Sequence, residues 1–122
     1  MILSNVLPKI PRLTVRFYRE PSGSEPVREW LKSLPDDEKR EIGTDIKTVQ
    51  FGWPIGMPIA APIERDIWEV RSRLSTRIAR VLFTLEGSEM VLLHGFIKKD
   101  RKTPRPELDL ARRRLKKLRG AL

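Results

Sequence analysis

The chain of 122 residues contains no cysteine, one histidine and one tyrosine. Without cysteine it forms no disulfide bonds and offers no thiolate metal ligands, a composition that fits an intracellular protein. With so little histidine and tyrosine, acid–base chemistry has few candidates. No apolar run approaches the roughly 20 residues of a membrane helix, and neither a glycine-rich phosphate loop nor a set of metal ligands is evident. We therefore expect a cytoplasmic protein that requires no metal and no cofactor.

Basic residues exceed acidic ones by nine, and the excess lies near the C-terminus. Residues 1–66 carry equal numbers of both signs, whereas residues 98–122 carry eleven basic and three acidic side chains. Such an asymmetry predicts an anionic partner: nucleic acid, an acidic protein or a membrane surface. The alternative is a solvated basic helix that only favours solubility.

Hydrophobic periodicity predicts a single domain over residues 13–122, preceded by an arm over residues 1–12 whose order the sequence leaves open. The proline- and glycine-rich residues 52–66 predict a loop or an extended crossing. The expected order is β-α-α-β-β-β-α. Strands are expected over residues 13–19, 67–73, 77–85 and 90–97, and helices over 24–34, 36–52 and 104–122. This order predicts an α+β fold, a small antiparallel sheet with helices packed on one face and the opposite face partly open.

Three segments carry a family resemblance. They read Ile-Trp-Glu-Val-Arg at 67–71, Arg-Ile-Ala-Arg-Val-Leu-Phe at 77–83, and a strand, His-Gly-Phe, paired lysines and Lys-Thr-Pro at 91–104. Over about residues 13–120 the chain resembles the RelE/ParE toxins, in their HigB-like, phage-associated branch. The resemblance implies a RelE-like fold and a type II toxin–antitoxin toxin that cuts mRNA in the ribosomal A site. It also implies a cognate antitoxin, usually of the helix-turn-helix type, as a partner beside the ribosome and mRNA, and no membrane.

RNA can be cut without a metal when the ribose 2′-OH attacks the adjacent phosphorus and leaves a 2′,3′-cyclic phosphate. Such a site needs proton-transfer groups and cations around the phosphorane. A tight turn at residues 75–76 predicts that Arg71 lies opposite Arg80, with Arg73 on the same face as Arg71. Because like charges across a sheet are destabilising, this cluster indicates an anion site. The alternative is that Glu69 neutralises either arginine in an ordinary surface pair.

The resemblance assigns roles to several basic residues. Arg80 matches the family's arginine that contacts the scissile phosphate, Arg71 and Arg73 match basic positions on the preceding strand, and Lys98 and Lys99 match the basic pair after the last strand. The candidate catalytic residues are Arg80, Arg71, Arg73, Lys99 and His94, and the candidate RNA-binding residues are Lys98, Lys102, Arg101 and Arg105.

His94 is the natural candidate for proton transfer, because its unperturbed pKa lies close to neutrality. It lies in an apolar strand with Leu92 and Phe96 expected on its face, so the alternative is a core histidine. Some members of the family place a catalytic tyrosine or histidine near the C-terminus, but the only tyrosine here is Tyr18. Proton transfer must then come from His94, from a lysine with a lowered pKa, or from the ribosome.

Two other functions stay open. ParE-like relatives share the fold but inhibit DNA gyrase, and a chain with this charge can also be an RNA-binding module without catalysis. The fold alone does not decide among these activities.

Overall fold

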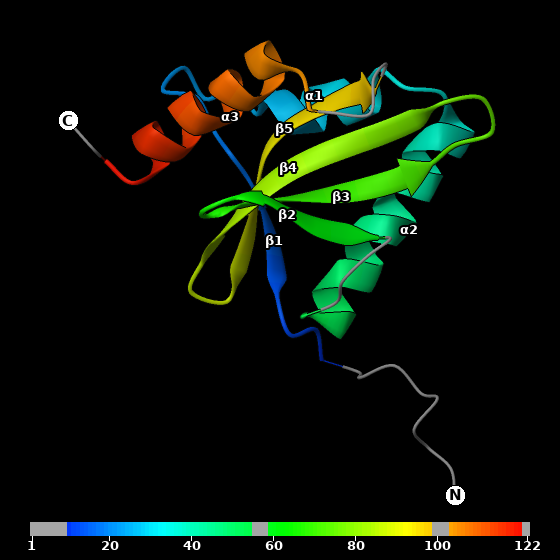
Figure 1. Ribbon diagram of the computed structural model, residues 1–122, viewed down its shortest axis with the longest axis horizontal. Helices are drawn as coiled ribbons and strands as arrows, with labels where there is room; N and C mark the ends of the chain where they lie inside the picture. The colour runs from blue at the N-terminus through cyan, green and yellow to red at the C-terminus, as the bar shows by residue number, and fades with distance from the viewer. Residues whose placement is uncertain (1–9, 55–58, 99–102, 121–122) are drawn as a thin grey trace, which may run out of the picture.

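The computed structural model describes residues 10–54, 59–98 and 103–120 (Figure 1). The first nine residues of the predicted N-terminal arm lie outside this part of the chain. The strands are β1 (Thr14–Phe17), β2 (Ala60–Glu64), β3 (Ile67–Arg73), β4 (Ile78–Glu86) and β5 (Glu89–Lys98), and the helices are α1 (Pro26–Lys32), α2 (Asp36–Gly52) and α3 (Arg105–Leu118). Within the described residues, no helix combines the length and apolar composition that crossing a bilayer requires.

One five-stranded sheet in the order β1-β5-β4-β3-β2 organises the fold. Strands β2 to β5 pair antiparallel in chain order, whereas β1 pairs parallel with β5. The α+β class is confirmed, but the expectation of a purely antiparallel sheet is wrong, because the sheet is mixed. Between β1 and β5 the chain passes through two helices and three strands, which gives it the length to return in the same direction.

Strand β2 lies within residues 52–66, where the sequence predicted a loop or crossing. Its Pro62 cannot donate to a ladder, but β2 is an edge strand, where a missing N–H is tolerated. A register shift between Pro62 and Glu64 follows at the same place. The proline content of this segment therefore led to the wrong expectation of a loop. The edge position of β2 in the sheet tolerates Pro62.

Helices cover both faces of the sheet, so the expectation that all of them pack on one face is wrong. Helices α1 and α2 cover one face through a core that includes Val27, Ile42, Val49 and Phe83. Helix α3 packs on the other face through Ala111, which is fully buried, and through half-buried leucines of its apolar stripe. In Figure 1, α3 and α2 lie on opposite sides of the sheet. The second core explains why β5 is apolar on both faces.

A β-bulge in β5 decides where the only histidine lies. Leu82 on β4 pairs with His94, while its neighbour Phe83 pairs with Leu92, so Leu93 is the extra residue. Leu92 belongs to the core under α1 and α2, whereas Leu93 belongs to the core under α3. After the bulge, His94 lies beside Phe96, and their rings stack with centroids 5.6 Å apart. The expectation that His94 shares a face with Phe96 is confirmed, and the expectation for Leu92 is wrong.

Candidate nucleic-acid interface

The β3–β4 hairpin brings basic side chains together on the sheet face that α3 covers only in part. Arg71 lies opposite Arg80, as the tight turn predicted. In the next row, Arg73 pairs with Ile78, which pairs with Lys98 on β5. In Figure 1, α3 lies over the other end of these strands, so no helix of the described residues covers the hairpin end on this face. The face that was expected to lack helices is therefore covered by α3 in part.

A buried carboxylate separates the two facing arginines. The Glu69 side chain is inaccessible to solvent, Arg71 Nε lies 2.5 Å from its Oε1, and Arg80 Nη1 lies 3.2 Å from its Oε2. Arg80 is 1% exposed and its Nη1 also donates to the Thr103 hydroxyl at 2.8 Å. Burial lowers the pKa of Arg80, the Glu69 charge raises it, and Arg71 lowers it further. The two arginines tolerate each other because Glu69 neutralises part of their charge, in a buried cluster and not in the surface pair considered above.

The two arginines differ in their access to solvent. About a third of the Arg71 side chain is exposed, whereas Arg80 is closed off by its neighbours. Arg71 can therefore meet an external anion without rearrangement, and Arg80 cannot. The contact with a scissile phosphate that the resemblance implies for Arg80 stays a prediction.

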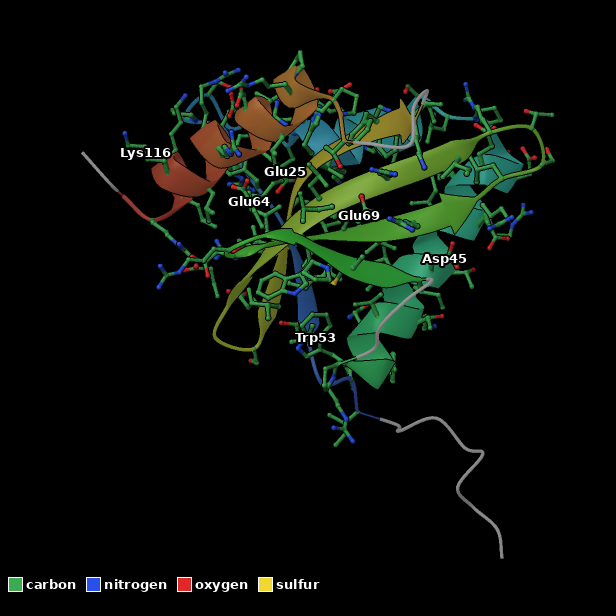
Figure 2. All side chains as sticks on the ribbon, viewed as in Figure 1. Glu25, Asp45, Trp53, Glu64, Glu69 and Lys116 are labelled. Atoms are coloured by element: carbon green, nitrogen blue, oxygen red, sulfur yellow. The ribbon has the colours of Figure 1, made fainter. Side chains whose placement is uncertain are left out.

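A pocket of about 290 Å³ opens beside this cluster. Arg71, Arg73 and Lys98 line it, and Glu41 and Asp45 of α2 form another part of its wall. Figure 2 shows Glu69 on the central part of the sheet and Asp45 on α2. Guanidinium groups suit phosphate because they donate paired hydrogen bonds to its oxygens. The pocket therefore combines three cations fit for a phosphodiester with two carboxylates that can accept a proton.

His94 lies under α3 in a hydrogen-bonded network. Its Nε2 is 2.6 Å from Glu107 Oε1, and its Nδ1 is 3.4 Å from Arg114 Nη1, which also donates to the Leu93 carbonyl at 2.8 Å. These partners fit a neutral ring that donates from Nε2 and accepts at Nδ1.

Burial is the main influence on the pKa of His94 and lowers it. The hydrogen bond to Glu107 and its charge raise this pKa, and the charge of Arg114 lowers it. His94 is therefore a neutral residue at neutral pH whose nitrogens both face α3. In this position His94 links β5 to α3 through its contacts with Glu107 and Arg114, which fits the alternative of a hydrogen-bonded core histidine.

The remaining candidates fall near or outside this region. Arg105 is exposed in the first turn of α3, and Lys98 lines the pocket. Lys99, Arg101 and Lys102 lie outside the described residues. Among the described residues, no three histidine, aspartate or glutamate side chains come together as a metal site.

Reasoning from the sequence named Glu69 as a partner of either arginine but missed its burial, and it missed the contact of Thr103 with Arg80. The signal for Glu69 was present, since the register that places Arg71 opposite Arg80 also places Glu69 opposite Leu82, diagonal to Arg80. Long side chains reach across such a diagonal. No comparable signal existed for Thr103, which lies 23 residues from Arg80 in the chain.

Comparison with known proteins gives one family match. No curated protein matches the chain. The family model for phage-derived protein Gp49-like (DUF891) matches residues 29–116, which is more than half of the chain and includes the buried cluster and the described residues of the pocket. The chain therefore belongs to the phage-derived Gp49-like family, a RelE/toxin-like family.

Proposed function

We propose that this protein is a HigB-like toxin of a type II toxin–antitoxin system, an endoribonuclease that cuts mRNA on the ribosome. One observation carries the proposal: Arg71, Arg73 and Lys98 line a single pocket. The basic sequence Lys-Asp-Arg-Lys at 99–102 follows directly after Lys98. A cationic pocket of this kind suits the backbone of single-stranded RNA, whose phosphates supply most of the binding free energy.

In the proposed reaction the ribose 2′ oxygen attacks phosphorus, and the 5′ oxygen of the next nucleotide leaves. The three cations stabilise the charge that builds up on the phosphorane oxygens. Because both ring nitrogens of His94 face α3, proton transfer falls to other groups. Glu41 and Asp45 in the pocket wall, Lys99, and groups of the ribosome are the candidates to take the 2′ proton and to protonate the leaving oxygen.

The proposed partner that restrains this activity is an antitoxin of the helix-turn-helix type. An acidic segment of the antitoxin would pair with the cations of the pocket and exclude RNA. Such a contact is electrostatic, so added salt should weaken it.

Purified protein added to ribosomes programmed with mRNA tests the function. We expect cleavage in the A site that leaves a 2′,3′-cyclic phosphate and a 5′-OH, identified by mapping the 5′ ends and analysing the 3′ ends. Ends with a 5′-phosphate and a 3′-OH would contradict the proposed chemistry. Intact mRNA together with loss of gyrase supercoiling would favour a ParE-like toxin instead. Binding to RNA without any cleavage would favour the non-catalytic RNA-binding module.

A further inference from the structure

Arg71 is held at one nitrogen, and part of its side chain is exposed. Its Nε donates to Glu69 Oε1 at 2.5 Å, and about a third of its side chain is accessible to solvent. Nη1 and Nη2 have no hydrogen-bond partner among the described residues, and Arg71 lines the pocket. A guanidinium bound through Nε keeps its two terminal nitrogens free as a fork, which is the geometry that grips two oxygens of a phosphate.

The Glu69 side chain is closed to solvent, whereas the Arg71 side chain with which it pairs is partly exposed. Its carboxylate is inaccessible to solvent, and Oε2 lies 3.2 Å from Nη1 of Arg80, which is itself 1% exposed. Two arginines and one glutamate leave this cluster with a net charge of one positive unit. One phosphodiester monoanion neutralises that charge, and the more negative phosphorane interacts with it more strongly.

We propose that Glu69 is a positioning residue that holds Arg71 by Nε so that its terminal fork faces an RNA phosphate in the pocket. Arg80 then serves as the buried counter-charge that holds the Glu69 carboxylate in place. This inference rests on the proposed function, since it assigns an RNA phosphate to the pocket. It differs from the resemblance, which places the phosphate contact on Arg80.

Whether Glu69→Gln weakens or tightens RNA binding distinguishes a positioning role of Glu69 from a purely electrostatic effect. Glu69→Gln removes a negative charge beside the pocket, so electrostatics alone predicts tighter RNA binding. Loss of positioning predicts weaker binding, because the Arg71 fork is no longer held toward the phosphate. A charge-assisted contact to phosphate corresponds to about tenfold in affinity or more, so we expect Glu69→Gln to weaken binding by about tenfold.

The probe is a fluorescein-labelled, single-stranded RNA oligonucleotide with methylated 2′ oxygens, which cannot be cut, and fluorescence anisotropy gives its affinity. Arg71→Ala should weaken binding by a similar factor. In the Arg71→Ala background, Glu69→Gln should then change the affinity by less than about twofold, since two residues that act through one contact are not additive. Unchanged or tighter binding by Glu69→Gln alone, or full additivity in the double variant, would overturn the inference.

Two charge-conserving variants keep the test valid if Glu69→Gln fails to fold. Arg71→Lys keeps the charge but loses both Nε and the fork, whereas Arg65→Lys changes an exposed arginine that does not line the pocket and for which the structure shows no contact with Glu69. We expect about tenfold weaker binding for Arg71→Lys and less than about twofold change for Arg65→Lys. Equal affinities of the two variants would overturn the inference.

Failure of the inference is distinguishable from failure of the proposed function. If the parent protein binds the oligonucleotide but leaves mRNA on programmed ribosomes intact, the nuclease proposal is wrong and the affinities still decide on Glu69. If the parent cuts mRNA and the variants follow plain charge, only the inference is wrong. A parent that binds no oligonucleotide overturns the inference, and the nuclease proposal falls with it only when mRNA on programmed ribosomes also stays intact.

Discussion

Arg71 and Arg80 face each other across two strands, but their surroundings predict different consequences of replacing them. Arg80 is almost completely buried against Glu69, so Arg80→Ala leaves a buried carboxylate with one counter-charge fewer. Removing one partner of a buried pair typically costs about 3–5 kcal/mol of stability. Arg71 is partly exposed and water can replace it, so Arg71→Ala should cost less than about 1 kcal/mol. Urea unfolding of both variants measures the difference, and equal losses would contradict the buried cluster.

The pH dependence of stability tests the position of His94 under α3. Burial lowers its pKa in the folded protein below the ordinary value, against the opposing effects of Glu107. The unfolded state therefore binds a proton that the folded state does not, and stability should fall as the pH decreases below about 6.5 toward the lower folded pKa. His94→Gln removes this contribution and leaves an amide that can still donate to Glu107.

The measurement is the difference in unfolding free energy between about pH 8 and about pH 5 for the parent and His94→Gln. Other titrating groups affect both proteins, so the comparison isolates His94. We expect a larger loss in the parent. An equal loss of unfolding free energy in the two proteins would show that folding does not lower the pKa of His94.

At the scale of elements, α1 packs on β5 at a point where only glycine fits. An ideal Cβ on Gly95 would overlap the ring of Trp30, which packs against the core from α1. Gly95→Ala should therefore cost about 1–3 kcal/mol, because the helix or the strand must shift. Gly43, within α2, is the matched control: a Cβ there meets no atom within 4 Å. Gly43→Ala should stabilise the protein by about 0.5–1 kcal/mol. Opposite signs in urea unfolding would support this packing, and a neutral Gly95→Ala would contradict it.

The elements that the sequence predicted well are those with local signals. The β3–β4 hairpin follows from alternating residues and a short turn, and its register follows from the turn length, which correctly placed Arg71 opposite Arg80. Helix α1 begins at a proline, α2 and α3 begin directly after one, and the helices end near glycine or proline, so their positions were also predictable. In each case the information lies within a few residues.

The elements that the sequence did not predict depend on distant partners. Pro62 argues against a strand unless its position at the sheet edge is known. Nothing in Leu92-Leu93-His94 marks the bulge, which depends on pairing with β4. The side of the sheet that α3 covers also depends on packing of its stripe against a second core. For the same reason, the candidate cations were found from the sequence, while the burial of Arg80 and the enclosure of His94 were not.

Over the whole molecule, the net charge of +9 overstates the cations that are free to meet RNA. Arg112 on α3 pairs with Glu64 and Asp109, and Arg119, directly after α3, pairs with Asp66 and Glu86. Arg114 is partly buried, where it donates to a backbone carbonyl and lies over the ring of Tyr18. Several charges of the basic C-terminal region therefore fasten α3 to the sheet. The positions of the cations therefore matter more than the net charge, and RNA binding should depend on the cations of the pocket.

Two variants with the same net charge separate a local site from the overall charge. Arg73→Ala removes a cation that lines the pocket, whereas Lys47→Ala removes an exposed cation of α2 that does not line it. For single-stranded RNA, each phosphate contact adds about 0.7 to the slope of log affinity against log salt concentration. We expect Arg73→Ala to reduce the slope by about this amount and Lys47→Ala to leave it unchanged. Anisotropy titrations of one oligonucleotide over a series of salt concentrations measure both slopes. If the two slopes fall equally, RNA responds to the total charge of the protein, and the pocket lined by Arg71, Arg73 and Lys98 is not its binding site.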